Sequence, residues 1–132
     1  MKYLIDTHIF LWLLYQPQKL DTQKINILQN SENDVYISSL SFWEISLKFA
    51  LGKLDISGVK PDELPDLAKR MGIEILEITT NEMASSYKLE KVKNHKDPFD
   101  RAMIWQSISN NLTMVNHDNK FSEYEKLGLK LL

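Results

Sequence analysis

The segment KYLIDTHIFLWLLY, residues 2–15, sets the architecture expected for the whole chain. Its apolar run at residues 3–5 ends at Asp6, and a longer apolar run at residues 9–14 soon follows, which is typical of a buried strand leading into a largely buried helix. Pro17 ends this helix because proline lacks the backbone N–H that a helix uses. A strand that passes directly into a helix indicates an α/β fold.

The same alternation of strand and helix continues to the end of the chain. We predict four more strands, at residues 35–37, 73–78, 112–115 and 129–132, and further helices near residues 21–31, 39–51, 61–70, beyond 80 and 97–110. Such alternation favours a parallel sheet covered on both faces. No internal repeat, low-complexity tract or linker divides the sequence, so we expect a single domain over residues 1–132.

Composition excludes several classes of function. The chain has 132 residues, of which 43% are hydrophobic, and its 16 basic and 18 acidic side chains give a net charge of -2. It lacks the basic coat of a general nucleic-acid binder, but this balance does not exclude local contacts with nucleic-acid phosphates. Cysteine is absent, which excludes disulfides, thiolate metal sites and a cysteine nucleophile, and suits a reducing cytoplasm. The N-terminal apolar stretch is shorter than the roughly 20 residues of a membrane span, so we expect a soluble, unprocessed protein without membrane partners.

Four carboxylates carry most of the information about function: Asp6, Glu44, Asp100 and Asp118. Each stands where an apolar run ends or a helix begins. If the runs are parallel strands, the acids converge beyond the carboxyl ends of the strands, where open α/β sheets bind their ligands. Like charges gathered in this way repel each other and raise each other's pKa values unless a cation neutralises them. The sequence therefore predicts a metal site.

Each acid taken singly also has a structural explanation. Asp6 or Thr7 can cap the helix that follows, and Glu44 can form an i,i+4 ion pair with Lys48. The ion pair accounts for Glu44 only on an exposed helix face, which its aromatic neighbours argue against.

The segment NHKDPFDR, residues 94–101, contains two acids with different expected roles. Asp97 before Pro98 has the form of a helix N-cap, and Asp100 then lies in the first helical turn, where a carboxylate is favourable. We predict that Asp97 is the cap and that Asp100 points into the crevice. Asp118 ends its strand as Asp6 ends the first strand. The joint placement of the four acids outweighs their separate explanations.

A set of motifs in a fixed order supports this interpretation. They are Asp6-Thr7-His8, Trp43-Glu44-Ile45 with Lys48 one turn later, Gly52-Lys53-Leu54, the segment from His95 to Arg101, and Asp118 followed by Phe121 and Tyr124. Together they resemble the PIN-domain nucleases, and closely the VapC-type toxins, over essentially the whole chain. The resemblance implies a three-layer α/β/α sandwich with a central parallel sheet of order 3-2-1-4-5. It places the acidic site on Asp6, Glu44, Asp100 and Asp118.

The expected chemistry follows from the donor atoms. Carboxylate and water oxygens suit Mg²⁺ or Mn²⁺, whereas the histidines are too scattered along the sequence to predict a zinc site: His8, His95 and His117. A bound metal can activate water for in-line attack on a phosphodiester, and no residue has the character of a covalent nucleophile. We assign a primary metal to Asp6, Glu44 and Asp100, and a second metal or a metal-bound water to Asp118.

Four further residues are expected to support the site. Thr7 can orient Asp6 or a metal-bound water through its hydroxyl, and Lys48 or Arg101 can meet substrate phosphates, although structural salt bridges explain these two cations equally well. Asn116 departs from the family pattern, in which threonine or serine is common two positions before the last aspartate. Its amide can still hydrogen-bond water or a ligand.

The resemblance further implies a substrate and partners. VapC-like proteins are endoribonucleases that cut tRNA, rRNA or mRNA, leave a 3′-hydroxyl and a 5′-phosphate, and are neutralised by a cognate antitoxin; a homodimer is also implied. An antitoxin arginine or lysine could occupy the acidic pocket in place of the metal. The apolar helices offer surface for such partners, although we expect most of the three tryptophans to lie in the core: Trp12, Trp43 and Trp105.

Other classes of protein also gather aspartates at a sheet edge. A phosphotransfer receiver domain needs an acidic pair after the first strand and a phosphoacceptor after the third, but Thr7-His8 and Thr79-Thr80 stand there instead. A catalytically silent PIN-like module that binds RNA or protein is disfavoured by the four intact acids. A non-toxin RNA-processing nuclease is compatible with the sequence.

Overall fold

Strand β1 (Lys2–Ile5) lies at the centre of the sheet because its last three side chains are apolar and buried. The computed structural model describes residues 1–132 and pairs β1 in parallel with β2 (Asp34–Ser38) on one side and β4 (Thr113–Val115) on the other. Strands β3 (Glu74–Leu76) and β5 (Lys130–Leu131) complete a five-stranded parallel sheet of order 3-2-1-4-5. The predicted class and strand order are confirmed.

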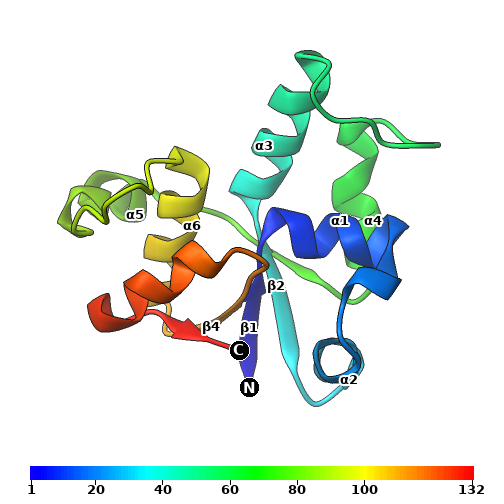
Figure 1. Ribbon diagram of the computed structural model, residues 1–132. Coiled ribbons are helices and arrows are strands. Elements are labelled where there is room, and N and C mark those ends of the chain that lie inside the picture. Colours follow the sequence, from blue (N-terminus) through cyan, green and yellow to red (C-terminus); the bar gives the residue numbers. More distant parts are fainter.

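Helices cover both faces of the sheet, which gives the three layers of an α/β/α sandwich (Figure 1). One face carries α1 (Thr7–Tyr15), α2 (Thr22–Gln29) and α4 (Leu64–Arg70); the other carries α5 (Thr80–Ser85), α6 (Pro98–Ser109) and the 3-10 segment η4 (Asn119–Leu127), drawn in orange. Helix α3 (Ser39–Ala50) continues from β2 beyond the carboxyl end of the strands. Short 3-10 turns lie at η1 (Pro17–Lys19), η2 (Pro61–Glu63) and η3 (Ser86–Lys88).

Alternating strand side chains feed two separate cores. Val115 packs with Ile5 and Phe10 in one core, whereas its neighbour Met114 packs with Tyr124 in the other. This division follows from the two-residue period of a strand, which sends successive side chains to opposite faces. The two cores fix the sheet between its helical layers, and so fix the edge from which the acids project.

Three details differ from the sequence-based expectations. The strand expected at residues 73–78 is restricted to β3, and η4 was not predicted at all. The expectation that most tryptophans are core residues is wrong: Trp43 of α3 is 62% exposed although its ring packs against Phe99 of α6, and Trp12 and Trp105 are half-buried. Helical spacing alone does not show which side of α3 the sheet covers. None of the helices combines the length and the apolar character needed to span a lipid bilayer.

Candidate metal centre

Asp6 lies at the carboxyl end of β1, where it holds two segments together. Its backbone N–H bonds the carbonyl of Val115 at the end of β4 (3.0 Å), which brings the following loop alongside. Carboxylate oxygen Oδ1 caps α1 by accepting from the Ile9 N–H (2.8 Å), whereas Oδ2 accepts from the backbone N–H (3.1 Å) and ring Nδ1 (2.9 Å) of His117. Asp6 is only 2% exposed. The capping explanation therefore uses only one of its two oxygens.

Glu44 enters the same region from α3 and is also 2% exposed. Its Oε1 accepts the Thr7 hydroxyl (2.6 Å), and its Oε2 accepts from the Lys48 ammonium (2.6 Å), which is the anticipated i,i+4 ion pair. We had expected Thr7 to orient Asp6 or a metal-bound water, but its hydroxyl positions Glu44. Burial alone would lower the pKa of Lys48, but the hydrogen bond to Glu44 and the nearby carboxylates outweigh it and raise that pKa. Lys48 therefore stays positively charged beside Glu44.

Asp97 and Asp100 divide their roles as the sequence indicated. Asp97 caps α6, because its Oδ1 accepts from the backbone N–H groups of Phe99 (2.9 Å) and Asp100 (3.1 Å). The Asp100 carboxylate instead faces His95, with 3.2 Å between Oδ2 and Nε2. Burial, followed by the charge of Asp97, raises the pKa of Asp100 to about 6, and the charge of Glu44 adds to this rise. The negative charges of two other acids, Asp97 and Glu44, therefore act on Asp100.

Asp118 lies just beyond β4 and caps η4 through a bond from the Lys120 N–H to its Oδ1 (2.9 Å). Ligand atoms of His95, Asp100 and Asp118 all lie within 4.8 Å of one another. The Asn116 side-chain amide donates to the Asp118 carbonyl (2.6 Å), so Asn116 shapes the turn that carries the acid.

Two cations predicted to contact substrate have different surroundings. Arg101 donates to the carbonyl oxygens of Leu89 (2.9 Å) and Glu90 (3.2 Å) and to the Tyr124 hydroxyl (3.0 Å), so the structural explanation accounts for its guanidinium. Tyr124 also bonds His95 Nδ1 (2.6 Å). A chain of hydrogen bonds therefore runs from Arg101 to Asp100. By contrast, the Lys48 side chain is 38% exposed at the edge of the acidic region.

Although the histidines are scattered along the sequence, each one lies beside a site acid in the structure, which the sequence analysis did not predict. His117 bonds Asp6, His95 bonds Asp100, and the rings of His8 and His117 stack with centroids 3.9 Å apart. The hydrogen bond to Asp6 raises the pKa of His117, whereas burial and the charge of His117 lower the pKa of His8. Each histidine lies close in sequence to a site acid, which was the available signal.

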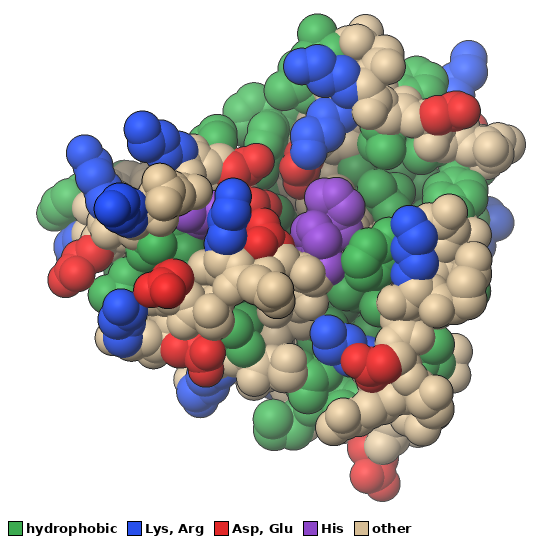
Figure 2. All heavy atoms as spheres, in the orientation of Figure 1, with side chains coloured by type: hydrophobic (Ala, Val, Ile, Leu, Met, Phe, Trp, Pro, Cys, Tyr) green, Lys and Arg blue, Asp and Glu red, His purple; other side chains and the backbone are tan.

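The four acids therefore come from four segments that meet beyond the carboxyl ends of β1, β2 and β4. Figure 2 shows acidic side chains in a central hollow of the surface, with histidine beside them and lysine and arginine around the rim. Carboxylate oxygens suit a divalent metal, and a cation would offset the charges of Asp97 and Glu44, which add to the effect of burial in raising the pKa of Asp100. The ligand atoms that lie within 4.8 Å of one another form two groups, Asp6 with His8 and His117, and Asp100 with His95 and Asp118, and Glu44 belongs to neither group.

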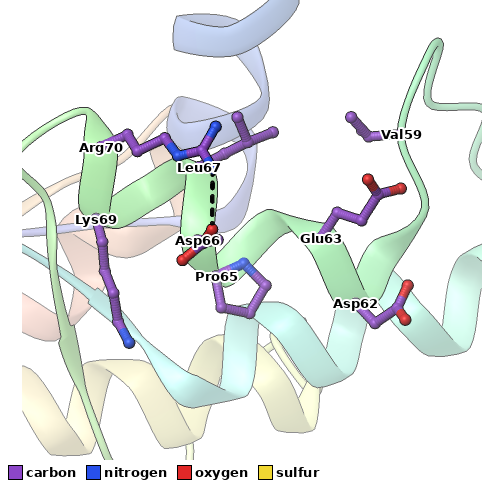
Figure 3. A pocket seen from close by; sticks show the side chains of 8 residues that line it. All are labelled: Val59, Asp62, Glu63, Pro65, Asp66, Leu67, Lys69 and Arg70. Atoms are coloured by element: carbon purple, nitrogen blue, oxygen red, sulfur yellow. Dashed lines mark hydrogen bonds and ion pairs between the residues drawn. The ribbon is translucent and has the colours of Figure 1, made fainter.

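A second surface hollow lacks such convergence (Figure 3). It lies over η2 and α4 and is lined by both acidic and basic side chains. The Asp66–Arg70 ion pair (3.3 Å) is exposed at both ends, and the labelled charged groups point in different directions. The hollow therefore offers no defined binding site.

Comparison with known proteins agrees with this fold. The family model of the PIN domain matches residues 3–127, so the chain belongs to the PIN-domain family. Among solved structures, the chain is similar to VapBC2 from Rickettsia felis bound to a promoter DNA fragment (TM-score 0.74, 18% identity, 100% of this chain and 98% of that chain). It is also similar to VapBC-1 from nontypeable Haemophilus influenzae (0.70, 18%, 100% and 97%) and to DNA-bound VapBC from Salmonella typhimurium (0.65, 16%, 100% and 97%). A search of curated proteins finds no match.

Proposed function

We propose that this protein is a Mg²⁺- or Mn²⁺-dependent endoribonuclease and the toxin of a toxin–antitoxin pair. The observation that carries the proposal is the convergence of Asp6, Glu44, Asp100 and Asp118 at the carboxyl edge of a parallel sheet, with the pKa of Asp100 raised to about 6. Membership of the PIN-domain family supports nuclease chemistry. Similarity to solved VapBC complexes supports the narrower toxin assignment.

Each site residue has a definite part in this chemistry. Asp6, Glu44 and Asp100 would hold the metal, which when bound would lower the pKa of a coordinated water and neutralise charge on the phosphate. Asp118, whose ligand atom lies within 4.8 Å of that of Asp100, would support a second metal or a metal-bound water. Thr7 fixes the rotamer of Glu44 through its 2.6 Å hydrogen bond, and the exposed Lys48 ammonium meets a substrate phosphate. The products are a 3′-hydroxyl and a 5′-phosphate.

The proposed partners are RNA, an antitoxin and a second copy of the chain, in the cytoplasm. Two of the solved relatives are described as DNA-bound VapBC assemblies and another as FitAB bound to a DNA fragment, which supports a bound antitoxin. An apolar groove between α3, α5 and α6 supplies candidate contact surface, since Trp43 and Met83 are more than half exposed at its rim. Exposed aromatic and methionine side chains are typical of protein interfaces.

The first test is cleavage of total RNA by purified protein with Mn²⁺, Mg²⁺ or EDTA. New 5′ ends identified by sequencing should depend on metal and disappear in Asp6→Asn. Asp21→Asn is the matched control, because Asp21 is also an aspartate N-cap, on α2, but lies outside the acidic site. Cleavage that survives in Asp6→Asn would contradict the site assignment. Intact RNA under every condition would favour a silent binding module, and cuts confined to precursor RNA would favour an RNA-processing nuclease.

A further inference from the structure

Two histidines and one acid form a separate set of donors at the edge of the acidic centre. His8 lies in the first turn of α1, His117 lies in the loop after β4, and Asp6 lies between these segments. Their ligand atoms all lie within 4.8 Å of one another. The segments are more than a hundred residues apart in sequence, so only the parallel pairing of β1 with β4 brings them together.

The geometry of His117 and Asp6 already matches two ligands of one ion. His117 Nδ1 and Asp6 Oδ2 are 2.9 Å apart, with a proton between them. Metal–ligand bonds of about 2.0 Å at a tetrahedral angle would separate the same two atoms by about 3.3 Å. A small ion can therefore replace the shared proton with only a slight outward movement of the ring.

His8 can supply the third donor because its side chain lies at the surface. The ring stacks on His117 at 3.9 Å between centroids and contacts the edge of Trp12 at 6.4 Å. Its exposure leaves room for the ring to turn toward the ion.

We propose that His8, His117 and Asp6 bind a transition-metal ion of the Zn²⁺ class, with a fourth position open to water. Two imidazole nitrogens and one carboxylate suit Zn²⁺, Co²⁺ or Ni²⁺, whereas Mg²⁺ selects oxygen ligands. The site is thus chemically distinct from the oxygen-rich site of Glu44 and Asp100, although the two share Asp6.

Because the two metal sites share Asp6, an ion in one site affects the other, and this step of the inference rests on the proposed nuclease function. An ion held by the two histidines withdraws Asp6 from the oxygen-rich site, so Zn²⁺ inhibits the Mg²⁺-dependent cleavage. Inhibition by Zn²⁺ would then follow from the arrangement of His8, His117 and Asp6 in this protein.

The test is direct binding of Co²⁺, which reports imidazole ligation by visible absorption and needs no RNA. We expect the intact protein to give a saturable band that a large excess of Mg²⁺ does not remove. His8→Asn and His117→Asn should each weaken Co²⁺ binding by at least about tenfold, since even indirect partners of a metal ligand are worth that much. Circular dichroism checks that both variants fold.

Asp100→Asn is the matched control, because it alters the acidic centre and leaves all three proposed ligands in place. Retention of the Co²⁺ band in this variant, with loss in the histidine variants, supports the site. Equal Co²⁺ binding in all proteins, or loss of the band only in Asp100→Asn, overturns it. A chain without nuclease activity that still binds Co²⁺ through the histidines would contradict the proposed function and keep this inference.

Discussion

Replacing Asp100 by asparagine should stabilise the metal-free protein at neutral pH while it removes a metal ligand. The reason is that burial and the neighbouring acids Asp97 and Glu44 raise the pKa of Asp100 from 3.8 to about 6. A carboxyl group with a raised pKa binds its proton more tightly in the folded than in the unfolded state. Its ionisation therefore opposes folding.

The size of the effect follows from the shift. A rise of about two pKa units corresponds to about 3 kcal/mol at most, present above pH 6 and absent below the unfolded pKa of 3.8. Asparagine reproduces the hydrogen bonds of the protonated group imperfectly, which costs about 1 kcal/mol. The net gain should be about 1–2 kcal/mol, or a melting temperature higher by about 4 °C.

The assay is urea unfolding in EDTA near pH 7.5 and near pH 5, with Asp21→Asn as the control. The control should differ little from the parent protein, because asparagine is an equally good N-cap. Asp100→Asn should be more stable near pH 7.5, and most of this advantage should vanish near pH 5. Destabilisation near pH 7.5, or an advantage independent of pH, would refute the reasoning.

Four further predictions follow from the same contacts. Thr7→Val removes the donor to Glu44 and should lower cleavage about tenfold, whereas Thr7→Ser should restore it; initial rates with Mn²⁺ test this. Tyr124→Phe removes the hydrogen bonds to His95 and Arg101 and should lower the free energy of unfolding in urea by about 1–3 kcal/mol; an unchanged midpoint would contradict a stabilising role for these hydrogen bonds. Mn²⁺ at a hundred times its dissociation constant should add about 2.7 kcal/mol to the stability of the parent protein, and calorimetry should show no such gain for Asp6→Asn. Trp43→Glu should leave the melting temperature within about 2 °C of the parent but weaken the association of the protein with a second copy or with its antitoxin, as measured by sedimentation. Unchanged association would exclude the groove between α3, α5 and α6 as the contact surface.

Features with local causes could be predicted from the sequence. The junction of β1 and α1 was predictable because an apolar run, a capping aspartate and a second apolar run lie next to each other. Asp97 was predictable as a cap because it precedes Pro98. By contrast, η4 was missed although its buried side chains Phe121 and Tyr124 lie three residues apart, and the exposure of Trp43 depends on which side of α3 the rest of the protein covers.

Some features of the candidate site could be predicted from the sequence, whereas others depend on the tertiary structure. The four acids stand out in the sequence through their joint placement where apolar runs end or helices begin, since each one singly has a structural explanation. Their roles as caps and as partners of specific donors, such as Thr7 with Glu44, depend on distances between elements. The histidine pair was missed because nothing in the sequence separation of His8 and His117 indicates contact.

Hydrophobic periodicity, helix caps and strand-end acids are properties of short segments, so the sequence alone predicted the α/β class and, through the family resemblance, the sheet order, both of which are confirmed. It also singled out the four acids, whose role stays a prediction. The pairing of β1 with β4 established that His117 bonds Asp6 and stacks on His8, and the packing of α6 against η4 established the chain from Arg101 to Asp100. Hydrogen bonds and metal ligation require atoms to lie within about 3 Å of each other, and such proximity between distant segments arises only when the sheet and its two cores have formed.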